Sequence, residues 1–195
     1  MDPISQSFQL LVNVFFNLLL FVVLLRFLLQ LVRADFYNPV SQAVARVTNP
    51  LLVPLRRIIP GYGGFDVASL VLLLLMEMLA TILLGFINGF GMVPILYVLL
   101  WAPLGIVSLF LSFYFFAILA SIVLSWVAPG NSSPVIHLLH QLTEPVMAPF
   151  RKISPPLGGL DLSPIFVFLA IQVARIFVNS AAQGVGLHPA LVVGF

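Results

Sequence analysis

Four long apolar stretches, each interrupted by few polar side chains, divide the chain and predict four membrane-spanning helices. A helix needs about 20 apolar residues to cross the hydrocarbon core of a bilayer. The stretches that meet this length cover residues 8–32, 67–87, 104–127 and 162–181. Pro94 and Pro103 interrupt the apolar sequence before the third stretch, so residues 92–102 are predicted to form a short or re-entrant segment. Five membrane segments instead of four are the alternative.

The composition excludes a soluble protein. Of the 195 residues, 62% are hydrophobic and 7% are charged, whereas a soluble domain carries roughly 25% charged residues. Eight Lys and Arg with six Asp and Glu cannot cover a water-facing surface. The chain has no cysteine, which excludes thiolate metal sites, and a net charge of +2 does not predict nucleic-acid binding. No cofactor and no enzyme activity are predicted.

The basic residues predict the orientation in the membrane. Six of them belong to the two long loops between spans: Arg33, Arg46, Arg56 and Arg57 in the first loop, and Arg151 and Lys152 in the second. Cytoplasmic loops collect Lys and Arg, so both loops are predicted to be cytoplasmic and both termini periplasmic, in a bacterial inner membrane. At that face these six side chains would contact the phosphates of anionic phospholipids or a partner protein.

An internal repeat is the most specific feature of the sequence. Residues 39–66 align without gaps to residues 134–161, at a constant offset of 95, with 11 identities in 28 positions. Most of the identical residues are Pro, Gly, Arg and Asp, rather than the Leu that is abundant in this chain. We therefore predict two parallel copies of one unit of span, loop and span, over residues 1–90 and 91–195.

Within each repeated loop the pattern predicts a pair of short amphipathic helices lying in the cytoplasmic interface. In the first loop, Asn38-Pro39 and Asn49-Pro50 each place an N-cap residue before a proline at the first helical position. After each helix pair, glycines form a turn and an aspartate caps the next span. These turn and cap residues are Gly63, Gly64 and Asp66 in the first copy, and Gly158, Gly159 and Asp161 in the second.

Four polar side chains within the spans are candidates for a functional site, because ionisable groups are costly inside a bilayer. They are Arg26, Glu77, Gln172 and Arg175. Glu77 lies eleven residues beyond Asp66, ~16 Å deep at the helical rise, and Gln172 is its counterpart in the repeat. One hypothesis is a polar site between the copies, where Glu77 binds a cation or a proton and an arginine supplies the counter-charge. The alternative is a buried ion pair that fixes helix packing.

Three stretches of the chain resemble the YggT family of bacterial membrane proteins, which is related to the YlmG proteins of Gram-positive bacteria and plastids. They are RADFYNPVSQ, NPLLVPLRRIIPGYGGFDVAS and its second copy TEPVMAPFRKISPPLGGLDLSP. The resemblance implies a non-enzymatic protein, linked in some members to osmotic stress and ion homeostasis and in others to cell division or cytochrome assembly. A channel-like or transport-related role is therefore expected. The alternative is a scaffold or assembly factor that presents its basic loops to lipids and membrane protein partners, and a homo-oligomer also stays open.

Overall fold

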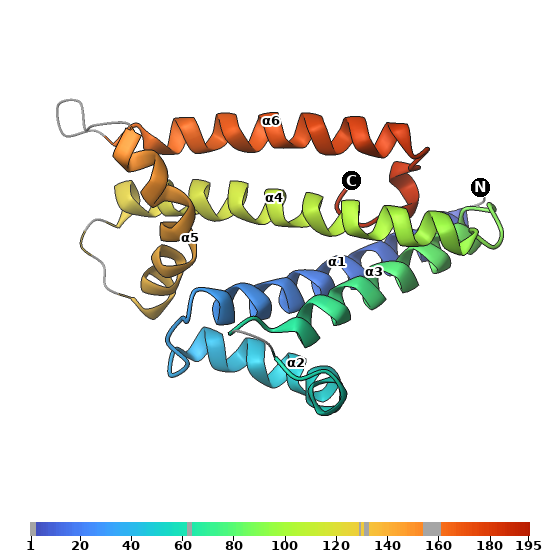
Figure 1. Ribbon diagram of the computed structural model, residues 1–195, viewed down its shortest axis with the longest axis horizontal. Helices are drawn as coiled ribbons and strands as arrows, with labels where there is room; N and C mark the ends of the chain where they lie inside the picture. Colours follow the sequence, from blue (N-terminus) through green and yellow to red (C-terminus); the bar gives the residue numbers. More distant parts are fainter. Residues whose placement is uncertain (1–2, 62–63, 129, 131–132, 154–160) are drawn as a thin grey trace.

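The computed structural model describes residues 3–61, 64–128, 130, 133–153 and 161–195, and these residues form an all-helical protein. The α-helices of this part of the chain are α1 (Pro3–Leu31), α2 (Pro39–Ile58), α3 (Val67–Ile87), α4 (Ile95–Val127), α5 (Pro134–Ile153) and α6 (Ser163–Gly184). A short 3₁₀ helix, Pro189–Leu191, follows α6. Figure 1 shows the helices in order along the chain.

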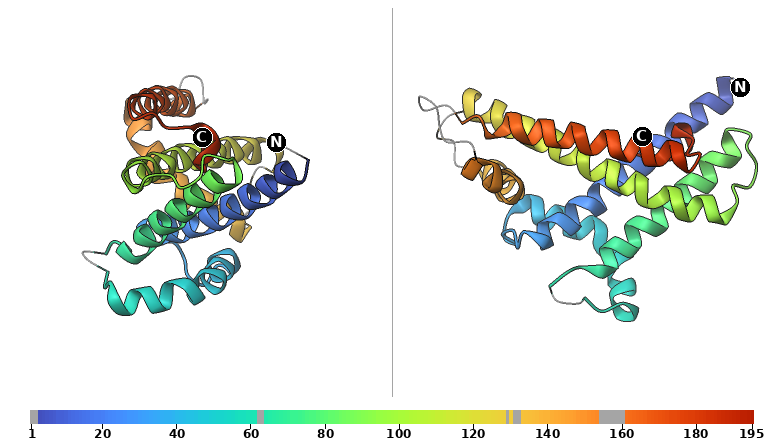
Figure 2. Two further views of the ribbon diagram at one scale, coloured as in Figure 1. Left: turned by 90° about the vertical axis from the view of Figure 1, so that its right-hand side faces the viewer. Right: turned by 45° about the horizontal axis from the view of Figure 1, so that its top comes forward.

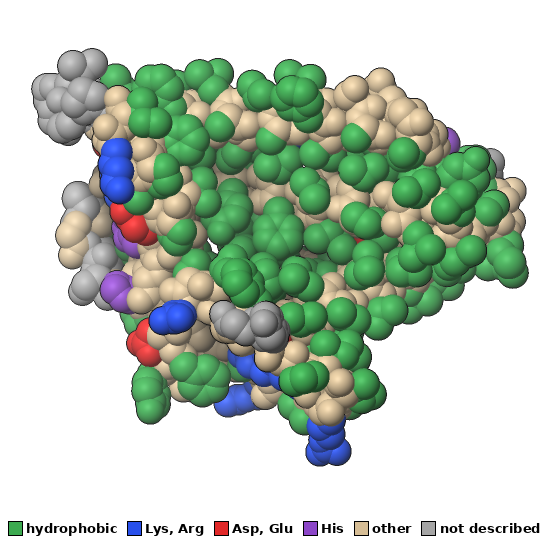
Figure 3. Space-filling model, in the orientation of Figure 1, with side chains coloured by type: hydrophobic (Ala, Val, Ile, Leu, Met, Phe, Trp, Pro, Cys, Tyr) green, Lys and Arg blue, Asp and Glu red, His purple; other side chains and the backbone are tan. Residues whose placement is uncertain are grey.

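Four of these helices, α1, α3, α4 and α6, are long and apolar enough to cross a membrane, which confirms the predicted number of spans. Their outward faces carry large exposed hydrophobic side chains, such as Phe8 on α1 and Phe177 on α6. In Figure 3 hydrophobic side chains cover most of the visible face, whereas Lys and Arg gather along the edge where α2 and α5 lie. A water-facing surface rarely exposes so much contiguous apolar area, but lipid tails would cover it.

The structure overturns the predicted separate segment over residues 92–102. Helix α4 runs unbroken from Ile95 to Val127, with Pro103 inside it and Pro94 as its N-cap residue. At 1.5 Å per residue its 33 residues are about 50 Å long, more than the hydrocarbon core requires. A proline removes one backbone hydrogen bond, but spans tolerate this where neighbouring helices support the backbone.

Each repeated loop forms one bent helix, so the prediction of two separate short helices was wrong. Pro50 and Pro54 lie inside α2, and Pro145 and Pro149 lie inside α5. Figures 1 and 2 show that the second half of α2 runs across the direction of its first half. An internal proline clashes with the preceding turn and bends a helix without necessarily ending it. The start predicted at Asn49-Pro50 is therefore inside α2.

Both bent helices are amphipathic. The buried residues of α2 are Ser41, Val44, Ala45, Thr48 and Leu52, which recur at helical spacing on one face. The Thr48 hydroxyl donates to the carbonyl of Val44 at 2.8 Å, and its counterpart Thr143 in α5 donates to Leu139 at 2.9 Å. A threonine that bonds back to the preceding turn satisfies its hydroxyl when buried, so it can face the bundle.

The helices form two groups that meet through α3 and α4. Helix α1 packs on α3 with α2 against both, and α4 packs on α6 with α5 against both. In Figure 1 the groups lie together at the end that holds the N-terminus and splay apart toward the end that holds α2 and α5. At that splayed end the starts of the two amphipathic helices are in contact. The amide of Asn38, the N-cap residue of α2, donates to the carbonyl of Pro134, the first residue of α5, at 2.6 Å.

The C-terminal segment turns back after α6 and packs into the bundle, as Figure 1 shows. Val192 and Val193 are 3% and 2% exposed. The Trp101 indole donates to the carbonyl of Val185, and the Ser108 hydroxyl donates to the carbonyl of Gly194. The segment beyond α6 is therefore part of the packed core of the protein.

Candidate functional site

Glu77 is the most deeply buried ionisable side chain that the structure describes. It lies in α3 with 0% exposure, and its Oε1 accepts a hydrogen bond from the backbone N–H of Val193 at 2.8 Å. Its Oε2 is buried without a hydrogen-bond partner, as is the Thr81 hydroxyl one turn further along α3. Gly105 of α4 lies so close that a Cβ there would be 2.8 Å from Oε1. The carboxyl is therefore enclosed by α3, α4 and the C-terminal segment.

The structure does not gather the other intramembrane polar residues around Glu77. Gln172 is exposed on α6, and α4 separates α6 from α3. The Arg175 guanidinium donates to the Ser112 hydroxyl at 3.2 Å and lies 5.4 Å from the centre of the Phe115 ring. Among the described residues, none of the ion pairs includes Glu77. The Glu77 carboxyl is thus bonded to a backbone N–H of the C-terminal segment, where the sequence predicted an arginine as its counter-charge.

Arg56 and Asp66 form a partly buried ion pair at the start of α3. Asp66 is 3% exposed and is the N-cap residue of α3, with its side chain accepting from the backbone N–H and the hydroxyl of Ser69. Arg56 also donates to the Gln30 side chain of α1 at 3.0 Å. Burial raises the pKa of Asp66, but the donors on Arg56 and Ser69 outweigh it and hold that pKa below its ordinary value.

The second copy makes the same pair in a more exposed setting. Arg151 donates to Asp161 at 3.1 Å and to Glu144 at 2.6 Å, and these side chains are between 44% and 51% exposed. Asp161 accepts from the backbone N–H of Ser163 at 2.9 Å. In both copies the paired Arg and Asp are 10 residues apart. The residues that repeat in the sequence thus include those that tie each amphipathic helix to the following span.

The remaining basic residues of the loops lie at the surface of the protein. Arg33, Arg46, Arg57 and Lys152 are all exposed, and none of them belongs to an ion pair in the part of the chain that the structure describes. Arg56 and Arg151, which are predicted to contact lipid phosphates or a partner protein, are each paired with a carboxylate in the structure. Of the predicted turn glycines, Gly64 has a φ of 88°, which favours glycine. Gly63, Gly158 and Gly159 lie outside the described residues.

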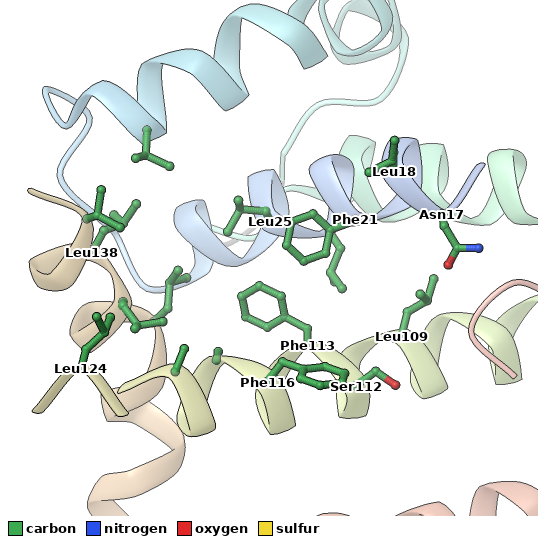
Figure 4. A pocket seen from close by; sticks show the side chains of 17 residues that line it. Asn17, Leu18, Phe21, Leu25, Leu109, Ser112, Phe113, Phe116, Leu124 and Leu138 are labelled. Carbon is green, nitrogen blue, oxygen red and sulfur yellow. The ribbon is translucent and has the colours of Figure 1, made fainter. Parts of the chain in front are cut away.

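Sequence reasoning missed a large apolar pocket between the two helix groups. Its volume is about 640 Å³, and side chains of α1, α2, α4 and α5 line it. Figure 4 shows Phe21 of α1 and Phe113 of α4 across the space from one another, and their ring centres are 5.9 Å apart. Asn17 and Ser112 are the polar residues of the lining. The pocket could not be predicted because its walls are ordinary apolar residues contributed by four separate helices.

Four apolar spans, two amphipathic helices at one end and an apolar outer surface define a multi-pass helical membrane protein. The family model described as CCB3/YggT matches residues 5–87 and matches again at residues 100–182. The chain belongs to the CCB3/YggT family. The two matches begin 95 positions apart (100 minus 5), which equals the offset of the sequence alignment.

The relatives that cover most of the chain are themselves named as uncharacterized proteins. An uncharacterized protein of Pseudomonas aeruginosa is 51% identical over 173 residues, which are 88% of each chain. The YggT protein of Escherichia coli K12 is 35% identical over 169 residues, 85% of each chain. The chloroplastic YlmG homolog protein 2 of Arabidopsis thaliana is 40% identical over 63 residues, 32% of this chain and 25% of its own length. No solved structure matches the chain.

Proposed function

We propose that the protein is a non-enzymatic membrane scaffold that holds α2 and α5 as two docking helices on the cytoplasmic leaflet of a bacterial inner membrane. The observation that carries this proposal is the repeated ion pair, Arg56 with Asp66 and Arg151 with Asp161. Each pair joins the end of an amphipathic helix to the start of the next span, so the helix has a set position relative to the membrane. A scaffold requires such a link between helix and span, and the link is more buried in the first copy than in the second.

The exposed basic side chains support the same proposal. Arg46 and Arg57 on α2 and Lys152 on α5 are free to contact lipid phosphates or an acidic partner. Each cationic side chain near an anionic leaflet contributes about 1 kcal/mol to membrane association. In this arrangement both loops are cytoplasmic and both termini periplasmic, and the two copies are parallel.

Photo-crosslinking in living cells tests the scaffold. A benzophenone amino acid replaces Gln42 on α2 or His137 on α5, which are exposed and correspond in the repeat. The expected result is a discrete protein adduct at each position. Arg56→Gln should weaken the adduct at position 42 strongly, and Arg151→Gln should weaken the adduct at position 137 less, because the second pair is exposed. The control position is Ile176, 67% exposed on α6, where lipid adducts are expected. Lipid adducts alone at both loop positions, or protein adducts that do not respond to the arginine variants, would refute the scaffold.

A second candidate function is ion or proton handling at Glu77, as expected for a channel-like protein in ion homeostasis and osmotic stress tolerance. The observation that favours it is the Glu77 Oε2 atom, which is buried in a span without a hydrogen-bond partner. Intramembrane carboxylates of this kind mark many ion and proton pathways. The test is ion flux through purified protein in liposomes. The scaffold predicts flux equal to that of empty liposomes, and flux abolished by Glu77→Gln would establish the second candidate in its place.

A further inference from the structure

A second pocket, polar and basic, lies where α1 ends and α2 begins. Its volume is about 310 Å³, and its polar lining comprises Arg26, Gln30, Arg33 and Ser41. Arg26 and Gln30 belong to α1, Arg33 to the turn after it, and Ser41 to the first turns of α2. No acidic side chain lines the pocket among the residues that the structure describes. Two cationic groups therefore face one small space without a carboxylate in its wall.

Two polar atoms in this wall are buried and lack a hydrogen-bond partner within the described residues. They are the hydroxyl oxygen of Ser41, a residue that is 4% exposed, and Nε of Arg26. A buried donor without an acceptor costs stability, so such atoms call for an explanation when they occur in a native protein. Both groups can donate, and their residues line the same pocket from two different helices. An acceptor-rich ligand in the pocket would satisfy both.

The backbone at Arg33 supports a role for this residue in the pocket. Arg33 has a φ of 52°, the left-handed conformation that usually follows a helix at a glycine. The turn is closed by the Ala34 N–H, which donates to the carbonyl of Leu29 at 2.9 Å. A non-glycine residue pays roughly 1–2 kcal/mol in this conformation. The backbone is thus strained at a position where a glycine would fit without strain. The residue at this position is an arginine that lines the pocket.

Nearby carboxylates do not neutralise these two arginines. Asp66 is paired with Arg56 and bonded to Ser69, so that pair is neutral as a unit. Asp35, in the turn, accepts from the backbone N–H of Tyr37 and does not line the pocket. Neither Arg26 nor Arg33 belongs to an ion pair among the described residues, so both cations are available to a ligand.

With the end of α1 taken as the edge of the membrane, the pocket lies at the level of the lipid headgroups. Arg26 lies five residues before the end of α1, which is ~7.5 Å along the helix axis. The interfacial layer on each side of the hydrocarbon core is about 5–7 Å thick. A pocket at this level meets phosphate groups from the membrane side and free anions from the water side.

We propose that this pocket binds a phosphate group. Arg26 and Arg33 supply the positive charge, and the Ser41 hydroxyl and the Gln30 amide supply further hydrogen bonds. Guanidinium groups match phosphate oxygens in geometry as well as in charge. The phosphate belongs either to an anionic phospholipid headgroup or to free phosphate, and the chemistry of the site is the same for both. The proposal holds whether or not α2 and α5 dock partner proteins.

The test is a binding titration on the purified full-length protein in a non-ionic detergent, followed by the shift in the thermal unfolding midpoint. The probes are a short-chain phosphatidylglycerol, inorganic phosphate, and a short-chain diacylglycerol that lacks the phosphate. We expect a phosphate-bearing probe to bind the wild type and the diacylglycerol to cause no shift. Stabilisation by phosphatidylglycerol alone identifies a lipid site, and equal stabilisation by inorganic phosphate identifies a free-phosphate site. Failure of both phosphate probes to bind would overturn the proposal.

Variants separate binding from folding. Ser41→Ala should weaken phosphate binding ~10-fold, the loss of one hydrogen bond to a charged ligand. Without ligand this variant should unfold at the wild-type temperature or above, because it removes a buried hydroxyl that has no partner. Arg26→Gln should weaken binding more than 10-fold, by removing a charge as well. The matched controls are Ser125→Ala, an exposed serine of α4, and Arg175→Gln in α6. Wild-type affinity in the pocket variants, or equal losses in the controls, would refute the assignment.

Discussion

The two copies of the Arg–Asp ion pair allow one prediction with an internal control. Replacing Asp66 with Asn removes the negative charge but keeps an N-cap side chain, since Asn and Asp cap helices about equally well. Asp66 is 3% exposed and its partner Arg56 is 33% exposed. Breaking a buried pair from one side costs 3–5 kcal/mol, and the partial exposure of Arg56 reduces this figure. We expect Asp66→Asn to lower the free energy of unfolding by about 2–3 kcal/mol.

The corresponding change in the second copy should be nearly silent. Asp161 and Arg151 are 46% and 44% exposed, and Arg151 retains Glu144 as a second partner at 2.6 Å. Exposed ion pairs contribute about 0–1 kcal/mol, so Asp161→Asn should cost no more than that.

The assay is chemical unfolding of both variants in detergent, followed by far-UV circular dichroism, which reports on all the helices. The deciding quantity is how much more Asp66→Asn lowers the free energy of unfolding than Asp161→Asn does, and this difference is expected to be about 2 kcal/mol. Equal losses, or a larger loss for Asp161→Asn, would refute the reasoning that burial decides the strength of the repeated pair.

Three further predictions concern pH and the surroundings of Glu77. The folded pKa of Asp66 lies below its ordinary value of about 3.9. The ionised carboxylate therefore stabilises the fold fully above that value, and this stabilisation is lost as the pH falls through the folded pKa. When unfolding is measured from pH ~5 downward, Asp66→Asn should lose stability less steeply than the wild type. Gly105→Ala should displace the C-terminal segment, because its Cβ would lie 2.6 Å from Val192 Cγ1. The control is Gly184→Ala, whose Cβ meets no atom within 4 Å. Carboxypeptidase should digest the Gly105→Ala variant faster than the wild type and the control at the wild-type rate. Glu77→Gln keeps an acceptor for the Val193 N–H and should change the unfolding temperature little, whereas Glu77→Ala leaves that N–H unpaired beside a cavity and should cost about 2–4 kcal/mol. Equal unfolding temperatures for the two Glu77 variants would contradict that account.

The membrane spans and the amphipathic loops could be predicted from the sequence because they depend on local properties. The predicted span 67–87 has the same bounds as α3. Apolarity over about 20 residues is sufficient for a span, whatever the rest of the chain does. The alternation of Pro, apolar and basic residues in the loops likewise predicted amphipathic helices. Local signals failed at the prolines, since whether a proline ends, bends or merely weakens a helix depends on the helices packed around it. That is why α4 is continuous and α2 is a single bent helix.

The candidate sites depended on contacts between distant parts of the chain, which only the tertiary structure decided. Glu77 was recognised as unusual from its position in a span, but its partner is a backbone N–H at Val193, 116 positions away, and a backbone group leaves no mark in the sequence. The repeated Arg and Asp are visible in the sequence of both copies, yet their pairing requires the end of each amphipathic helix to lie beside the start of the next span. The phosphate pocket joins Arg26 to Ser41 across a turn whose left-handed residue is not a glycine. Composition and periodicity determine which segments lie in the membrane, whereas packing determines which polar groups meet there. Each such contact joins two segments, and the sequence of neither segment alone specifies that they come together.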